Sequence, residues 1–496
     1  NFSTSASTGE FEHNPCSSSS SSSEEAEAEA GERTQWQGVV CSNSSTACAT
    51  QSCHIIVLNL PGYNLNGVLN KSLGGLSHLE ELVLADNMVQ GEIPSSLGDL
   101  PMLQLLDFDN NYFSGKIPSS LQNLTSLKFL YLQQNFLTGP IPPELGKLVT
   151  LQKLWLHYNR LTGHIPPQLG ALSQAQFIYL NGNLLTGPIP PELGDLGQLQ
   201  FLYLYENMLT GQLPPELSAL TQLRFLVPYD NLLTGPIPPE YGLLEDLSYF
   251  LFNNNMLTGS IPPELGNLTN MQMFYLYQNL LTGPIPAELG YLSNVQQFFL
   301  YRNMLTGSIP AQLCNMTKMQ HFYILDNMMT GTIPPEMGQM VDMRFIYADK
   351  NLFTGPIPSE LGSLTRMQFL YLNRNMLTGP IPPELGAIQY MAYLYLDNNM
   401  LSGTIPPGLG NLVQFVDLFL YENMLTGIVP SEFGQLVKLQ YLYLDANMLS
   451  GSMPSSMGGL ESVQFFYVRE NMMTGPIPST LGALGAVKEL FFFDNL

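Results

Sequence analysis

The sequence has few charged residues and very few basic ones. Of its 496 residues, 11% are charged, and 17 Lys and Arg stand against 40 Asp and Glu, a formal net charge of −23. The phosphates of nucleic acids and of anionic membrane surfaces repel so acidic a chain, so we expect no nucleic-acid partner. Hydrophobic residues make up 45% of the chain, too many for a disordered acidic tail. The chain must therefore bury a large core.

The sequence also lacks the motifs of membrane spans and of catalytic centres. It contains no run of 18 apolar residues, so we expect no membrane span in this chain. Its six His share no metal-ligand spacing, and HExxH, CxxC, GxSxG and glycine-rich phosphate loops are absent. We therefore predict a protein that is not an enzyme, with no catalytic residue, no cofactor and no metal.

What the sequence does contain is one repeat of 24 residues. The Asn that closes the pattern LxxLxLxxN recurs every 24 residues from Asn87 to Asn495, which gives 17 intervals and so 18 units. A degenerate unit with Tyr63 in place of the Asn precedes them. A strict period of this length is typical of a solenoid, in which each unit buries its apolar face against its neighbours.

Each part of the repeat has a physical role. Inward residues such as Leu151, Leu154 and Leu156 surround a short strand, and we expect neighbouring strands to pair in a parallel sheet. The Asn side chain can satisfy backbone groups that the turn leaves unpaired. Gly after Leu-Thr permits a tight bend, and Ile-Pro-Pro sets an extended segment. A brief helical turn is predicted at Pro-Glu-Leu-Gly.

This repeat resembles the plant-type extracellular leucine-rich repeat (LRR), whose signature places LxGxIP after LxxLxLxxN. The resemblance covers residues 55–496, and Trp36 to Cys41 (WQGVVC) resembles the WxGVxC end of that family's N-terminal cap. It implies an α/β solenoid, a curved right-handed superhelix with a parallel concave β-sheet. About 19 units of 24 residues would carry short helical or 3₁₀ turns on the convex side. Family members are receptor ectodomains, polygalacturonase inhibitors and cell-wall proteins, which implies an extracellular, secreted or surface location.

Three parts follow along the chain. Residues 1–35 form a low-complexity Ser/Glu/Ala arm, residues 36–54 a Cys-containing N-terminal cap, and residues 55–496 the solenoid without a C-terminal cap. The family's usual helical N-terminal cap is missing. No island loop, which several receptors of the family use for small ligands, interrupts the repeats. Since the chain starts at Asn1 without Met or a signal sequence, it is expected to be processed or truncated.

Cysteines and glycosylation motifs also point to a secreted glycoprotein. The resemblance suggests pairing Cys16 with Cys41 and Cys48 with Cys53, although four Cys allow three connectivities. Cys314 replaces the Gly of PPELG, and we expect a small buried thiol there. Six N-x-Ser/Thr motifs predict N-linked glycans at Asn1, Asn43, Asn70, Asn123, Asn267 and Asn315.

Aromatic residues mark the outward positions of the predicted concave sheet. The first aromatic stripe holds the residues four positions before the Asn, and the second holds those six positions before it. The predicted binding face comprises Tyr131, Trp155, Tyr179, Tyr203, Tyr275, Phe299, Tyr323, Tyr347, Tyr371, Tyr395, Phe419, Tyr443 and Tyr467 of the first stripe and Phe129, Phe177, Phe201, Phe369 and Tyr393 of the second. These rings either stack on one another at the strand spacing of about 4.8 Å or leave an apolar patch on the order of 1,000 Å² for a partner.

The residue directly after the Asn is apolar in all but one unit, and ten units have Met there. We call these residues the methionine row. One interpretation is soft packing at the edge of the core, because Met fills irregular gaps. The other is a hydrophobic flank along the rim of the concave face.

Two functions fit these features. The first is structural: the chain assembles head to tail with itself into a filament through an open terminal strand, using Leu490, Phe491, Phe492, Phe493 and Asn495. The alternative is a recognition ectodomain or inhibitor that binds an extended peptide, glycan or protein on the aromatic concave face.

Overall fold

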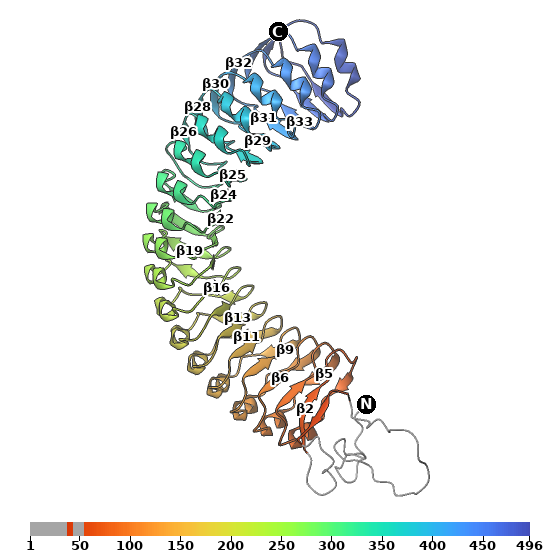
Figure 1. The fold of residues 1–496 in the computed structure, drawn as a ribbon, viewed down its shortest axis with the longest axis vertical. Helices are drawn as coiled ribbons and strands as arrows, with labels where there is room; N and C mark the ends of the chain where they lie inside the picture. Colours follow the sequence, from red (N-terminus) through yellow and green to blue (C-terminus); the bar gives the residue numbers. More distant parts are fainter. Residues whose placement is uncertain (1–36, 43–53) are drawn as a thin grey trace, which may run out of the picture. The chain divides into compact units, whose positions relative to one another are not determined.

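The structure is a computed structural model that describes residues 37–42 and 54–496 (Figure 1). It divides into two compact units, Asn1–Leu233 and Thr234–Leu496, and each unit is described by itself. In both, each repeat Asn follows a short strand, and most repeats add a second strand after the Asn and a 3₁₀ turn. We call the strands before the Asn the concave row and those after it the second row.

The concave row of the first unit is a parallel, in-register sheet. Equivalent residues of successive repeats face each other, so that Tyr131 pairs with Trp155 and Trp155 with Tyr179. The first strand, β1, is the exception and pairs antiparallel with β2. The row consists of β1 (Val39–Cys41), β2 (Ile55–Asn59), β4 (Glu81–Val83), β6 (Leu105–Asp107), β8 (Phe129–Tyr131), β10 (Lys153–Trp155), β12 (Phe177–Tyr179), β14 (Phe201–Tyr203) and β16 (Phe225–Val227).

The second row of this unit is a 7-stranded sheet made of β3 (Asn66–Val68), β5 (Met88–Glu92), β7 (Tyr112–Gly115), β9 (Phe136–Gly139), β11 (Arg160–Gly163), β13 (Leu184–Gly187) and β15 (Met208–Leu209). Its 3₁₀ turns are η1 (Lys71–Gly75), η2 (Ser95–Asp99), η3 (Ser119–Asn123), η4 (Pro143–Lys147), η5 (Pro167–Ala171), η6 (Pro191–Asp195) and η7 (Pro215–Ala219).

The concave row of the second unit has the same parallel register. Its strands are β18 (Tyr249–Leu251), β20 (Met273–Tyr275), β22 (Gln297–Phe299), β24 (His321–Tyr323), β25 (Phe345–Tyr347), β27 (Phe369–Tyr371), β29 (Tyr393–Tyr395), β31 (Asp417–Phe419), β33 (Tyr441–Tyr443), β35 (Phe465–Tyr467) and β37 (Glu489–Phe491).

The second row of this unit forms two sheets, β17 (Thr234–Gly235), β19 (Met256–Gly259), β21 (Leu280–Pro284) and β23 (Met304–Thr306), then β26 (Thr354–Gly355), β28 (Met376–Gly379), β30 (Met400–Thr404), β32 (Met424–Gly427), β34 (Met448–Gly451) and β36 (Met472–Met473). The 3₁₀ turns are η8 (Pro239–Leu243), η9 (Pro263–Asn267), η10 (Ala287–Tyr291), η11 (Ala311–Asn315), η12 (Pro335–Gln339), η13 (Ser359–Ser363), η14 (Pro383–Ala387), η15 (Pro407–Asn411), η16 (Ser431–Gln435), η17 (Ser455–Gly459) and η18 (Ser479–Ala483).

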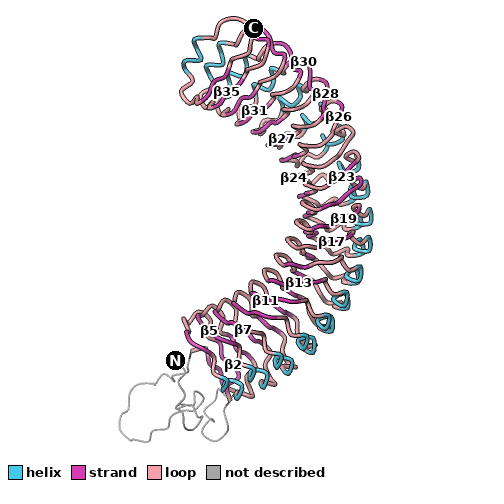
Figure 2. The backbone as a smooth tube through the Cα atoms, turned by 180° about the vertical axis from the view of Figure 1, so that it is seen from behind, coloured by secondary structure: helices cyan, strands magenta, loops and turns pink. Residues whose placement is uncertain are grey.

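Within each unit the strands and the 3₁₀ turns occupy opposite surfaces (Figures 1 and 2). The layer between them is the core, in which the inward Leu residues such as Leu151, Leu154 and Leu156 are fully buried. This arrangement confirms the predicted LRR solenoid with its parallel sheet, second row of strands and short turns.

The side chain of the repeat Asn connects each repeat to the one before it. Asn135 Nδ2 donates to the carbonyl oxygens of Phe108 and Gln133, both at 2.9 Å, while its Oδ1 accepts from the amide of Phe113 at 2.9 Å. The same bonds recur along both units and satisfy turn groups that the core would otherwise bury unpaired. Asn495 makes them too, because its partners Val468 and Met473 precede it.

The residue before each Asn has a left-handed backbone. In 17 of the 18 units it is not Gly, and its φ lies between 47° and 57°. In the remaining unit the position holds Gly182, with φ 62°. Since a side chain in this conformation is strained, the turn before the Asn places a row of strained residues along the rim of the concave face.

The Gly of PPELG permits close contact between successive 3₁₀ turns. A Cβ on Gly146 would lie 2.1 Å from the carbonyl oxygen of Gln168 in the next turn. Cys314 occupies the equivalent position as a free, buried thiol, and burial raises its pKa to about 11. The prediction of a small buried thiol is therefore confirmed.

Several sequence predictions fall on residues outside the described part. They concern Asn1, Cys16, Asn43, Cys48 and Cys53, together with the arm and most of the cap. Cys41 is disulfide-bonded, and the proposed pairing of the four cysteines stays a prediction. Within residues 37–42 and 54–496 no helix has the length and apolarity that crossing a membrane requires.

Candidate functional site

The first aromatic stripe is a continuous stack of rings in each unit. In the second unit, the centroids of neighbouring rings from Tyr275 to Phe491 lie 4.1–4.7 Å apart, and their planes differ by 2–18°. In the first unit Trp155 lies between Tyr131 at 4.5 Å and Tyr179 at 5.3 Å. The in-register strands therefore bring the rings face to face, as the stacking interpretation predicted.

The second stripe stacks in shorter runs. Phe201 lies between Phe177 at 4.8 Å and Phe225 at 4.7 Å, and Phe369 and Tyr393 are 4.4 Å apart. Charged and polar residues interrupt the runs. One of them is Lys153, whose Nζ lies 5.0 Å from the centroid of the Phe177 ring. This arrangement allows a favourable cation–π contact.

Mutual stacking determines what the concave face offers to a partner. Both ring faces are covered by neighbours, so solvent meets ring edges and tyrosine hydroxyls. Tyr395 donates its hydroxyl proton to Asp417 Oδ2 at 2.6 Å, and Tyr275 and Tyr467 bond in the same way to Gln297 and Glu489 of the next repeat. A partner of the concave face therefore meets ring edges and hydroxyl groups rather than ring faces.

The residues two positions before each Asn form a third column beside the stripes, which the sequence analysis missed. We call it the variable column, because it holds nine residue types in 18 repeats, whereas the first stripe is aromatic in 14 of them. It holds Ala85, Asp109, Gln133, His157, Asn181, Tyr205 and Tyr229 in the first unit and Asn253, Tyr277, Tyr301, Leu325, Asp349, Asn373, Asp397, Tyr421, Asp445, Arg469 and Phe493 in the second. This variation was the signal that could have identified it.

Carboxylates of the second unit are buried in and beside this column. Burial raises the pKa of Asp349 and Asp445 to about 6 each, and it raises the pKa of Asp397 and Asp417 as well. Asp445 accepts from the amide of Arg469 at 2.9 Å. The Oδ1 atoms of Asp349, Asp397 and Asp417 have no hydrogen-bond partner among the described residues. Burial of these acceptors without a partner is unfavourable.

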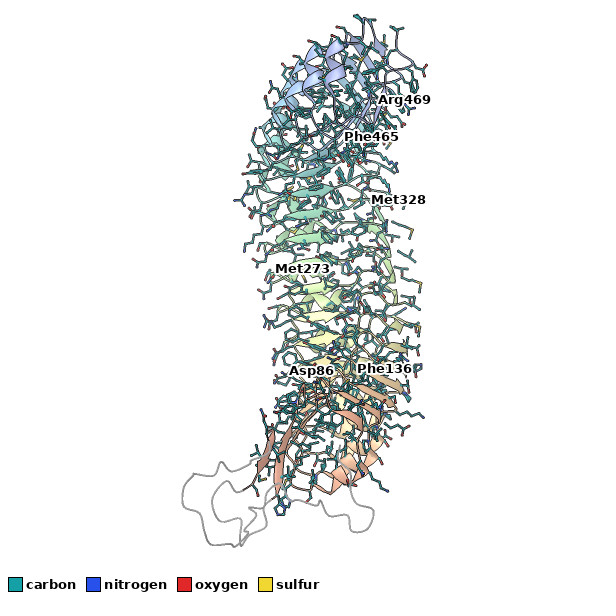
Figure 3. All side chains as sticks on the ribbon, turned by 90° about the vertical axis from the view of Figure 1, so that its right-hand side faces the viewer. Asp86, Phe136, Met273, Met328, Phe465 and Arg469 are labelled. Atoms are coloured by element: carbon teal, nitrogen blue, oxygen red, sulfur yellow. The ribbon has the colours of Figure 1, made fainter. Side chains whose placement is uncertain are left out.

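The methionine row is partly exposed at the surface. Its Met residues are 38–47% exposed, and all but Met328 open a second-row strand. Phe136 and Met328 of this row project outward from their repeats in Figure 3. More than half of each Met is covered, so both interpretations, soft packing at the edge of the core and a hydrophobic flank of the concave face, stay predictions.

Four predicted glycosylation sites lie in the described part, and all are exposed: Asn70, Asn123, Asn267 and Asn315. The last three each end a 3₁₀ turn, namely η3, η9 and η11. The side chain of Asn70 accepts from the amide of Ser72 at 3.0 Å and caps η1. The turn side of the repeats is therefore open to glycan attachment, which stays a prediction.

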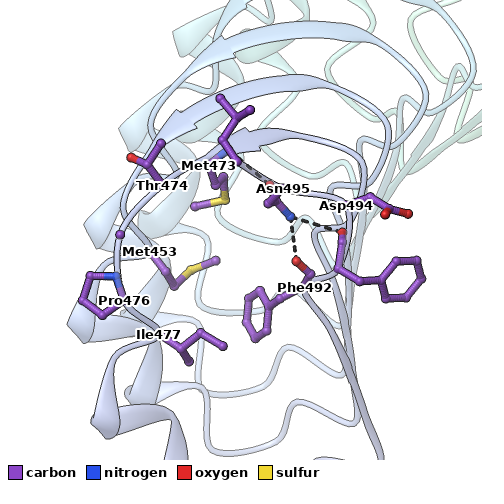
Figure 4. A pocket seen from close by; sticks show the side chains of 11 residues that line it. Met453, Met473, Thr474, Pro476, Ile477, Phe492, Asp494 and Asn495 are labelled. Atoms are coloured by element: carbon purple, nitrogen blue, oxygen red, sulfur yellow. Dashed lines mark hydrogen bonds between the residues drawn. The ribbon is translucent and has the colours of Figure 1, made fainter.

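The proposed assembly end is partly packed within its own unit. Phe491 stacks on Tyr467 at 4.7 Å, and Phe492 packs edge-on against Phe466 at 5.5 Å. A cavity of about 290 Å³ opens beside them, lined by Met453, Met473, Thr474, Gly475, Pro476, Ile477, Phe492, Phe493, Asp494, Asn495 and Leu496 (Figure 4). Of the three Phe residues, only Phe493 is strongly exposed.

Residues that bind metals are not brought together. In the part of the chain that the structure describes, no three His, Cys, Asp or Glu side chains are placed to hold a metal ion. His157 and His321 lie on the concave side, and burial lowers the pKa of both imidazoles.

The family models that match the chain all describe leucine-rich repeats. "Leucine-rich repeat region" matches residues 39–176. "Leucine rich repeat" matches residues 389–449, and a further model of that description matches 174–196, 198–220, 246–268 and 366–388. Among proteins with curated descriptions, none matches this sequence.

Solved structures with similar folds include plant receptors. The plant peptide hormone receptor RGFR1, in complex with RGF2, is 30% identical, with 93% of this chain and 83% of that one covered and a TM-score of 0.84. The Arabidopsis receptor kinase HAESA ectodomain, in complex with an extended IDA peptide hormone, is 29% identical, with 93% and 80% covered and a TM-score of 0.75.

HAESA also appears in complex with IDA and the co-receptor SERK1. That structure is 30% identical, with 87% and 80% covered and a TM-score of 0.64. The HAESA complexes contain a peptide hormone, and the second also contains a co-receptor. The repeats, the strand register and these similarities agree, and the chain therefore belongs to the plant-type extracellular leucine-rich-repeat protein family.

Proposed function

We propose that this chain is an extracellular, non-enzymatic recognition module whose concave face binds an extended peptide. One observation carries the proposal: a stacked, regular floor of rings lies beside a column that holds nine residue types in 18 repeats. A regular floor fixes where a ligand lies, and a varied column distinguishes one ligand from another. The peptide complexes of RGFR1 and HAESA support the peptide as the ligand class.

The chemistry of the face favours a peptide over a glycan. Sugars bind aromatic residues by lying flat on a ring face, but mutual stacking covers those faces here. The remaining tyrosine hydroxyls and carboxylates suit the amide groups of a peptide. Given the net charge of −23, we expect a peptide with basic residues, whose association slows as salt is added.

A peptide-display selection on the purified chain tests this function. We expect enriched peptides to bind wild type and to bind the Tyr179→Ala and Tyr371→Ala variants about tenfold more weakly or worse, because each removes a ring from the middle of its stack. The matched control is Tyr291→Ala, at an exposed Tyr that ends η10. If no peptide is enriched, or if the control weakens binding equally, the concave face is not the peptide site.

Head-to-tail assembly is the second candidate. The cavity beside Phe492 and the exposed side chains of Ile477, Phe493 and Leu496 favour it, because apolar surface of this kind marks interaction sites. Electron microscopy of the native protein tests it. Fibres that disappear when Phe491, Phe492 and Phe493 are replaced by Asp would support assembly, whereas isolated particles at every concentration would refute it.

We also propose that the chain is a secreted glycoprotein with three parts, the arm at residues 1–35, the cap at 36–54 and the solenoid from 55 onward. The exposed glycosylation motifs support this proposal. Mass spectrometry after enzymatic removal of N-linked glycans would convert each occupied Asn to Asp. Absence of that conversion at Asn123, Asn267 and Asn315 in protein from a secretory host would contradict it.

A further inference from the structure

Polar atoms without partners gather in one stretch of the first unit. Three successive residues of the variable column, Gln133, His157 and Asn181, leave Oε1, Nδ1 and both amide atoms, respectively, without a hydrogen bond among the described residues. Nε1 of Trp155, in the adjacent stripe, is in the same state. Gln133 is 5% and Asn181 1% exposed. Burial of such groups unpaired costs free energy, so a native protein supplies them with a partner.

The neighbouring amides show that the fold itself is not the reason. In the same repeats, the side chains of Asn159 and Asn183 form hydrogen bonds with several backbone groups of their own and the preceding repeat. The free atoms are confined to the outward positions, where successive strands lie about 4.8 Å apart. The unpaired groups are therefore a feature of the concave face.

The unpaired atoms offer both acceptors and donors without a net charge. Gln133 Oε1 and Asn181 Oδ1 accept, Trp155 Nε1 and Asn181 Nδ2 donate, and a neutral imidazole does one or the other at Nδ1. Burial lowers the pKa of His157 to about 4, so the ring is neutral at physiological pH. A group that both donates and accepts is the natural complement.

Charged ligands fit these atoms less well. Asp109, which is hydrogen-bonded to Gln133, lies near the carboxylates of Asp86 and Asp107, so an anion would be repelled. A cation would meet the donors of Trp155 and Asn181. The uncharged amide group, with one N–H donor face and one carbonyl acceptor, avoids both conflicts.

A tyrosine lies across this stretch. The ring of Tyr158 occupies the space beside Gly182, where a Cβ would lie 2.4 Å from its Cδ1 atom, and its hydroxyl reaches the Tyr205 hydroxyl at 3.4 Å. Tyr158 is itself exposed. Its ring thus rests against the residue that follows Asn181, and it lies edge-on to the His157 ring at 5.4 Å.

We propose that Gln133, Trp155, His157 and Asn181 form a binding seat for an uncharged amide group, with the Tyr158 ring at its edge. That the amide belongs to a peptide rests on the proposed function. The existence of the seat does not rest on the proposed function, because its polar atoms are unpaired whatever the ligand. Two sources share this chemistry, namely the side-chain carboxamide of Asn or Gln and the peptide backbone.

The indole of Trp155 reports on the seat. The chain has two Trp, so the Trp36→Phe variant leaves Trp155 alone. Its ¹⁵N indole resonance is followed during titration with acetamide, which mimics a side-chain carboxamide, and with N-methylacetamide, which mimics the backbone. Acetate and methylammonium are the charged controls. We expect a saturable shift with at least one amide and none with either ion.

Substitutions separate the seat from a general effect. Asn181→Leu keeps the volume and removes both amide atoms, so the amide should bind about tenfold more weakly or worse. Asn411→Leu, at an exposed Asn that ends η15 of the second unit, is the control and should leave binding unchanged. Should Asn181→Leu fail to fold, Gln133→Leu makes the same test from the other end.

Three outcomes would overturn the seat. The first is no shift with either amide, which would mean that an ordered water alone pairs these atoms. The second is an equal shift with acetate. The third is unchanged amide binding in Asn181→Leu. Failure of the proposed function looks different. Amides would still shift the Trp155 resonance while the display selection enriched no peptide.

Discussion

The ring of Tyr158 lies against Gly182 of the next repeat, so closely that a Cβ on Gly182 would stand 2.4 Å from Cδ1 and 2.8 Å from Cε1. Among the 18 units that carry the Asn, this is the only one with Gly in the left-handed position before it. The exception is explained by the neighbour: no other residue leaves space for the Tyr158 ring.

We therefore predict that Gly182→Ala displaces Tyr158 and lowers the free energy of unfolding by about 1–3 kcal/mol, because the methyl group clashes with the ring and strains the left-handed backbone. Urea unfolding followed by circular dichroism measures the change. In a Tyr158→Ala background the clash is absent, so the same substitution should cost less. An equal cost in both backgrounds would show that the ring does not need the space.

The converse change should stabilise the second unit. Ala446 has φ 49°, and its methyl group gains nothing that offsets the strain. Ala446→Gly should therefore raise the free energy of unfolding by about 0.5–1 kcal/mol. The control is Ala392→Gly, in the same unit at a position outside the left-handed row, which should be neutral or destabilising. A loss of stability at both sites would contradict the account of backbone strain.

Removal of one repeat Asn should weaken the hydrogen bonds between two successive repeats. Asn447 Nδ2 donates to the carbonyl of Leu420 at 2.9 Å, and its Oδ1 accepts from the amide of Leu425 at 3.0 Å. Asn447→Ala leaves these buried groups unpaired and should cost about 2–4 kcal/mol. Hydrogen exchange provides the local measurement, because the Leu425 amide should lose protection.

The control for this substitution is Asn411→Ala, at an exposed Asn that ends η15. It should leave both the global stability and the exchange of the Leu425 amide unchanged. Retained protection of that amide in Asn447→Ala would mean that water or a rearranged turn replaces the side chain.

The fold could be predicted from the sequence because the same pattern of residues occurs in 18 repeats. Leu154 and Asn135 occupy inward positions whose surroundings are the same in every repeat. The spacing of the repeat alone therefore predicts where these side chains lie. The stacking of Tyr371 on Tyr395 followed for the same reason, since in-register strands place equal positions opposite each other.

The site was less predictable, because it depends on differences between repeats. The repeat pattern is defined by the residues that recur, and the variable column was missed because its residues do not recur. The exposure of Met88 and Met448 was left open, because hydrophobic character alone does not distinguish the edge of a core from its rim. The unpaired amide of Asn181 depends on side-chain orientation in three adjacent repeats, which no single repeat encodes.

A buried carboxylate of the second unit gives a prediction about pH. Asp349 is 7% exposed, and burial raises its pKa from 3.8 to about 6. Between pH 4 and pH 6 the unfolded chain releases this proton before the folded one does, so stability from this group falls as the pH rises. Asp349→Asn removes the buried charge and should stabilise the unit by about 1–2 kcal/mol at pH 7 but not near pH 3.5. Urea unfolding at the two pH values measures this difference, with Asp246→Asn, at an exposed carboxylate of the same unit, as the control. A gain that is equal at both pH values, or larger in acid, would show that the charge of Asp349 does not limit stability.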